Sequence, residues 1–122
     1  MARPFVRSTI LPIYRAALHL VLIDEARPPW KTIDRLLGAP AERRTDFGAL
    51  HYMHETNTVL VFTREDLGAN TIVHELGHAA FDILKRAGIK ADPANQEAFT
   101  HLAGYMATWV FEKLDVPIRS PR

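Results

Sequence analysis

The chain has 122 residues, of which 48% are hydrophobic and 24% are charged, a composition typical of one soluble globular domain and unlike that of disordered or fibrous proteins. Its 15 Lys and Arg against 14 Asp and Glu give a formal net charge of +1, so no excess positive charge indicates binding to nucleic acid or to an acidic membrane surface. The absence of cysteine excludes disulfide scaffolds and thiolate zinc sites, so a metal ion would have to be held by His, Asp and Glu.

We expect residues 1–10 and 116–122 to be flexible. Residues 13–23 are predicted to form a strand, because apolar residues nearly alternate there with Arg15 and His19. These polar residues interrupt the apolar run, and no uncharged run elsewhere is long enough to cross a membrane, so we expect a cytoplasmic protein.

The middle of the chain predicts a short helix and a pair of strands. Two prolines ending at Pro29 favour the start of a helix, which should end near Leu37 because Gly38 follows it. Residues 47–55 and 56–63 are rich in β-formers around a polar turn. They are therefore expected to be adjacent antiparallel strands.

Two helices are predicted in the last third. Residues 69–87 carry apolar side chains at helical spacing and are followed by Gly88, a common C-terminal cap. Asp92 before a proline predicts the start of a second helix that runs to about Leu114. We therefore expect one α+β domain over residues 1–122, with a small antiparallel or mixed sheet packed on the first of these helices and on a second, C-terminal helix.

The first of these helices contains the sequence "HELGH". At about 100° per residue, His74 and His78 lie about 40° apart on one face, one turn from each other, so both imidazoles can reach one metal ion. Glu75 lies beside them, where a general base could take a proton from a metal-bound water. The apolar residues centre on the opposite face, which argues against buried core histidines; they are Ile72, Leu76, Ala80, Ile83 and Ala87.

A hydrolytic zinc site needs a third protein ligand, and the second helix offers two. Glu97 and His101 share the polar side of that helix, opposite its apolar stripe. A strictly antiparallel helix pair would put His101 level with His78 and Glu97 one turn nearer the loop. This estimate favours His101, although crossed helices shift such levels. For either residue to be the third ligand, the polar stripes of the two helices must face each other.

"HELGH" followed by "NQEAFTHLAGYM" resembles the zincin metallopeptidases of the glutamate-ligand branch, and the small ImmA/IrrE-like and phage-encoded zincin-like proteins. The resemblance covers roughly residues 57–105. It implies Zn²⁺ as the cofactor, His74 and His78 as ligands, Glu75 as the base and Glu97 as the third ligand.

One position departs from that pattern. Larger relatives often carry, four residues after the ligand glutamate, an aspartate that orients a metal-bound imidazole, and this chain has His101 there. Asp82, one turn after His78, is a candidate for this acceptor role.

Several other residues are weaker candidates. Tyr105 could donate a hydrogen bond to an oxyanion, although packing is the more common role of such a tyrosine. His51 and His54 could contact substrate, but histidines on strands are more often incidental. Gly77 and Gly104 are expected to let the two helices approach closely.

The function expected from these features is zinc-dependent hydrolysis of a protein or peptide substrate. An extended substrate could pair with the strand around residues 59–62, if that strand forms the edge of the cleft. The alternatives are a phage or mobile-element zincin-like module for binding or assembly with little or no proteolysis, and a hydrolase of a non-peptide substrate. The sequence leaves the oligomeric state open.

Overall fold

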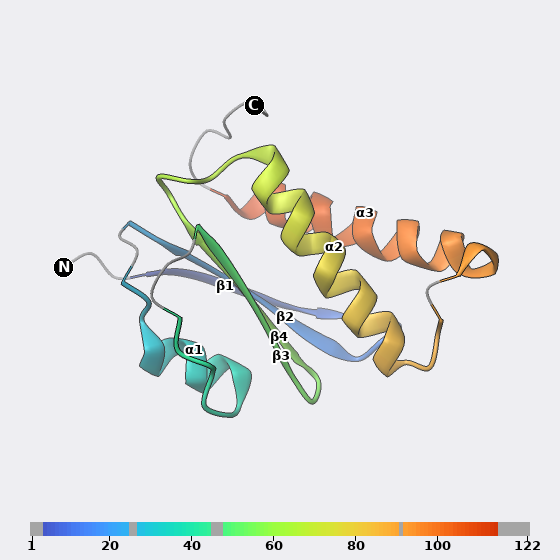
Figure 1. Cartoon of the computed structure of the whole chain (residues 1–122), viewed down its shortest axis with the longest axis horizontal. Helices are drawn as coiled ribbons and strands as arrows, with labels where there is room; N and C mark the ends of the chain where they lie inside the picture. Colours follow the sequence, from blue (N-terminus) through green and yellow to red (C-terminus); the bar gives the residue numbers. More distant parts are fainter. Residues whose placement is uncertain (1–3, 25–26, 45–47, 91, 115–122) are drawn as a thin grey trace.

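The computed structural model describes residues 4–24, 27–44, 48–90 and 92–114, and it contains a four-stranded mixed sheet with helices on both faces (Figure 1). The strands are β1 (Phe5–Leu11), β2 (Ala16–Ile23), β3 (Ala49–His54) and β4 (Asn57–Thr63). The helices are α1 (Trp30–Leu37), α2 (Ala69–Arg86), a 3-10 turn η1 (Pro93–Asn95) and α3 (Gln96–Lys113). The expected α+β class is confirmed.

The sheet order is β1-β2-β4-β3, with β2 and β4 parallel and the outer pairs antiparallel. The strand predicted within residues 13–23 is β2, and the predicted antiparallel pair is β3 and β4. Phe5–Leu11 pair with β2 along their whole length, so the N-terminal segment expected to be flexible, residues 1–10, contains most of strand β1. Residues 116–122, also expected to be flexible, lie outside the described part of the chain.

Alternation along the strands divides the apolar side chains between two layers. Leu18, Leu20 and Phe62 belong to a core beneath α2 and α3. Val21 and Val61 point to the opposite face, where they pack with residues of α1. Because both faces of β2 and β4 are covered, these central strands read as nearly continuous apolar runs.

The helix ends follow the sequence signals. Gly38 ends α1 in the left-handed conformation with φ of 82°, which only glycine adopts without a Cβ penalty. Gly88 adopts φ of 81° just after α2 and donates its N–H to the carbonyl of Lys85. The Asp92 carboxylate accepts from the N–H of Ala94 at 3.0 Å, as expected of an N-cap, although the first turn is η1 and α3 begins at Gln96.

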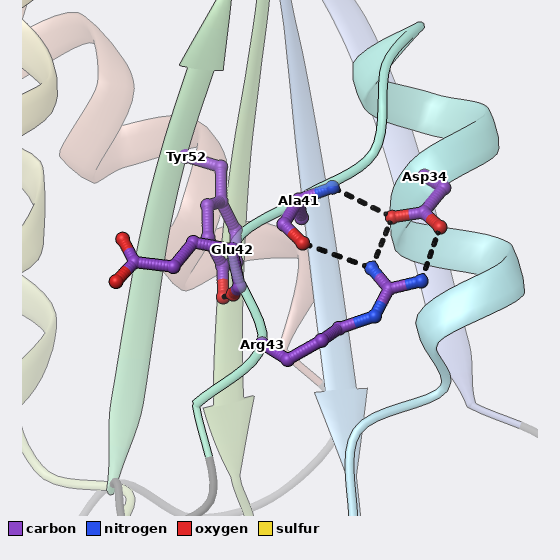
Figure 2. A network of polar contacts seen from close by, with 5 residues as sticks. All are labelled: Asp34, Ala41, Glu42, Arg43 and Tyr52. Atoms are coloured by element: carbon purple, nitrogen blue, oxygen red, sulfur yellow. Dashed lines mark hydrogen bonds and ion pairs between the residues drawn. The ribbon is translucent and has the colours of Figure 1, made fainter.

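A polar network fixes the segment after α1 to the sheet (Figure 2). The Asp34 carboxylate accepts from the Arg43 guanidinium through both oxygens at 2.7 Å and from the Ala41 N–H at 2.8 Å. These donors lower the pKa of Asp34 to about 2, with the Arg43 hydrogen bond as the largest cause. The Tyr52 hydroxyl donates to the Glu42 carbonyl, which joins the segment to β3.

Candidate metal centre

Helix α2 holds the two motif histidines on the side away from the sheet. Ile72 and Leu76 are buried in the core and fix the rotation of the helix about its axis. His74 and His78 are exposed as a result, and 67% of the His74 side chain is accessible. The predicted exposure of both imidazoles is confirmed.

The two imidazoles converge on each other. The Nε2 atoms of His74 and His78 are 3.2 Å apart, and the ring planes meet at 79° with centroids 4.7 Å apart. Two tetrahedral ligands with zinc–nitrogen bonds of about 2.0–2.1 Å would place their nitrogens about 3.3 Å apart, so the pair fits two corners of a zinc site. A hydrogen bond between two neutral imidazoles has a similar length, so a direct measurement of metal binding distinguishes a zinc site from a hydrogen-bonded pair.

Glu75 occupies the flank of α2 that faces the sheet edge. Its side chain is 15% exposed, and its Oε2 atom lies 3.8 Å from the His74 Nε2. The carboxylate is therefore largely screened from solvent but close to the exposed histidine pair. This is the location that the sequence predicts for a general base beside the metal.

His51, one of the weaker candidates from the sequence, is a neighbour of this flank. Leu50 and Tyr52 point to the α1 side of the sheet, so His51 points to the α2 side. Its side chain is 11% exposed, with Nδ1 3.8 Å from the Asp82 carboxylate. Burial lowers the pKa of His51, and the negative charges of Asp82 and Glu75 act against this.

The other ring nitrogen of His51 is also informative. Its Nε2 atom is buried and has no hydrogen-bond partner among the described residues. Asp82, expected as an acceptor for a metal-bound imidazole, is instead beside His51. His54 lies at the β3–β4 turn, where its Nε2 is 3.7 Å from the Glu55 carboxylate. The alternation of β3 was the sequence signal that could have singled out His51.

The candidate third ligands lie elsewhere on α3. Glu97 and His101 contact each other at 3.2 Å, and their side chains are 89% and 81% exposed. Within the described ranges, no three His, Asp or Glu side chains form a group able to hold a metal ion, so neither residue joins the histidine pair. Tyr105, the candidate oxyanion donor, lines a cavity of about 100 Å³ with His101 and the β1–β2 turn.

The packing of the two helices explains this separation. They meet through apolar side chains, with the rings of Phe81 and Phe99 4.7 Å apart, rather than across two polar stripes. A Cβ added at Gly77 or Gly104 would have no heavy atom within 4 Å, so the expectation that these glycines allow close helix approach is wrong.

The strand order also changes the expected cleft edge. β4 lies between β2 and β3, so the suggestion that residues 59–62 form an edge strand is wrong. β3 is the strand at the edge beside Glu75, and no described strand pairs with its outer side. The Thr63 N–H donates to the Gly48 carbonyl, and antiparallel pairs alternate, so the backbone groups of His51 and Met53 point outward from this edge.

Comparison with family models, curated proteins and solved structures found no match to the chain. No helix within the described residues is long and apolar enough to cross a membrane. Function is therefore inferred from the geometry of α2 and β3.

Proposed function

We propose that this protein is a metal-dependent hydrolase, most specifically a zinc metallopeptidase, with His74 and His78 as two metal ligands and Glu75 as the general base. The observation that carries the proposal is the 3.2 Å separation of the two exposed Nε2 atoms beside the Glu75 carboxylate. Zn²⁺ bound there would supply a Lewis acid that lowers the pKa of water and polarises a carbonyl.

Glu75 carries the proton-transfer part of the proposed mechanism. Its carboxylate accepts a proton from the attacking water and passes it to the leaving amine. The small exposure of this side chain limits competition from bulk water, while the neighbouring histidines remain open to solvent. A peptide carbonyl can therefore approach the histidine pair from the solvent side of α2.

Glu97 is the third ligand in this proposal, on the strength of the sequence resemblance, and His101 is the alternative. Both lie in the first turns of α3, apart from the histidine pair, so binding would require this end of α3 to approach α2. Zinc affinity measured for Glu97→Ala and His101→Ala assigns the ligand, because only the true ligand's variant should weaken binding.

The outer edge of β3 is the proposed site for an extended peptide. Outward N–H and C=O groups at His51 and Met53 can pair with a substrate strand and hold it beside Glu75. This replaces the internal strand β4 as the substrate-binding strand. A substrate bound in this way would be an unfolded segment and not a compact protein, because only an extended backbone can add to a sheet edge.

One observation favours the alternative of a binding or assembly module. Glu97 stands apart from the two histidines, so the described residues complete only part of a hydrolytic metal site. A module of this kind would retain its binding function without Glu75, whereas a hydrolase would not.

Cleavage of an unfolded protein such as casein by the zinc-loaded chain tests the proposal. Glu75→Gln should retain zinc and lose cleavage by at least about 100-fold, since a positioned general base contributes roughly 10²–10⁴-fold. Glu112→Gln, an exposed change on α3, is the matched control and should leave cleavage unchanged. Equal cleavage by the wild type and Glu75→Gln would contradict the assignment.

A further inference from the structure

A second cluster of chemically active side chains crosses the sheet on its α1 face. Ser8 of β1 and His19 of β2 are direct cross-strand partners, and Asn57 begins β4 on the far side of β2. His19 is two residues before Val21, which packs in the α1-side core, so the cluster lies on the face opposite α2. It is therefore separate from the candidate metal centre.

Hydrogen bonds connect the three side chains so that each donates to the next: Ser8 to His19, and His19 to Asn57. The Asn57 Nδ2 donates to the Leu37 carbonyl at 3.2 Å, so its Oδ1 is the atom 3.1 Å from the His19 Nε2. An amide oxygen only accepts, and the proton of the imidazole must therefore be on Nε2. This leaves Nδ1 as an acceptor, and the Ser8 hydroxyl, 2.7 Å away, donates to it.

The same arrangement activates a serine nucleophile: a hydroxyl group, a neutral imidazole that acts as its base, and an amide that fixes the tautomer of the imidazole. Ser8 is exposed and His19 is half-buried, so a reagent can reach the hydroxyl while the base stays fixed by its neighbours. The Asn57 amide is itself anchored to the C-terminal end of α1, which restricts its rotation.

We infer that Ser8, His19 and Asn57 form a metal-independent nucleophilic site that accepts the acyl group of an activated ester. Ser8 Oγ bonds to the ester carbonyl carbon while the bond to the leaving oxygen breaks, and the leaving group departs with that electron pair. The Ser8 proton moves to His19 Nδ1 and then to the leaving group or solvent. Ser8 and His19 are the catalytic residues, and Asn57 is a positioning residue.

Acetylation by p-nitrophenyl acetate in the presence of EDTA, mapped by peptide mass spectrometry, tests this inference. The chain's other serine, Ser120, is an internal reference of the same chemistry. Ser8 should be acetylated at least about 10-fold faster than Ser120, a conservative figure for general-base assistance. His19→Ala should reduce the Ser8 rate to that of Ser120, with folding checked by circular dichroism.

Two Asn57 variants separate positioning from structural support. Asn57→Asp retains an oxygen for His19 but loses the donor to Leu37, so Ser8 acetylation should persist; Asn57→Ala should lose it. A purely structural Asn57 would make both variants slow. Glu75→Gln should leave acetylation unchanged, which separates this site from the proposed peptidase. The inference is overturned if wild-type Ser8 reacts no faster than Ser120, or if folded His19→Ala reacts like wild type.

Discussion

Replacing His51 by leucine should stabilise the metal-free protein at pH 7. The His51 side chain is 11% exposed, and its Nε2 is buried with no partner among the described residues. An unsatisfied buried polar atom costs about 1–3 kcal/mol, and leucine of similar volume removes that cost. Because burial lowers the pKa of His51, the neutral imidazole forms no ion pair with Asp82 at this pH that the variant would lose.

The expected gain can be measured by urea denaturation with EDTA present. With a slope of about 1.5 kcal/mol/M, about 1–3 kcal/mol raises the urea midpoint by about 0.7–2 M. The matched control is His54→Leu on the same strand, where the side chain is 43% exposed and the change should stay within about 0.5 kcal/mol.

The pH dependence gives a second test of the His51 argument. A lowered folded pKa means that, below the unfolded value of 6.5, the unfolded chain binds a proton before the folded one does. The stability of the wild type should therefore decrease as the pH is lowered below 6.5. The difference in unfolding free energy between His51→Leu and the wild type should widen by at most about 1.4 kcal/mol per pH unit. If the variant is no more stable than the wild type at pH 7, or if the stability difference stays constant below pH 6.5, the buried His51 imidazole does not destabilise the fold.

The fold and the β3 edge lead to three further predictions. Asp34, whose pKa is lowered to about 2 by Arg43, contributes stability above pH 4 that disappears as the pH falls towards 2, and Asp34→Asn should flatten this acid limb of the denaturation curve. Leu76→Ala should cost about 2–5 kcal/mol in urea denaturation because the residue is only 2% exposed, and a cost below about 1 kcal/mol would contradict its place in the core. Met53→Pro removes an outward N–H at the β3 edge and should weaken peptide cleavage while the protein keeps its zinc. Val61→Pro, in contrast, should unfold the internal strand β4. Unchanged cleavage by Met53→Pro would exclude this edge as the substrate site.

Sequence periodicity was sufficient for α2 because one helix determines its own faces. The apolar residues Ile72 and Leu76 place the motif histidines on the exposed side whatever the rest of the fold does. The relation between His78 and Glu97 is different, since it depends on how α3 is rotated about its axis. That rotation is set by long-range packing, including Phe81 against Phe99, which no local pattern contains.

The order of the strands in the sheet also could not be predicted from local sequence patterns. The segment with Arg7 and Ser8 at its centre has little apolar alternation, and it forms β1 because β2 offers a pairing edge. The parallel pairing of β2 with β4 joins residues about forty positions apart, such as Leu20 and Leu60. This pairing moves β4 to the interior and leaves β3 at the edge, so the substrate-binding strand could not be assigned from sequence.

Calorimetric titration of the EDTA-treated, dialysed protein with Zn²⁺ measures whether His74 and His78 hold a metal ion. We expect one zinc per chain, with binding lost in His74→Ala and in His78→Ala and retained in His54→Ala, whose imidazole lies at the β3–β4 turn. Absence of zinc binding by the wild type, or equal binding by the wild type and His78→Ala, would show that the 3.2 Å contact is a hydrogen bond between imidazoles and not a metal site.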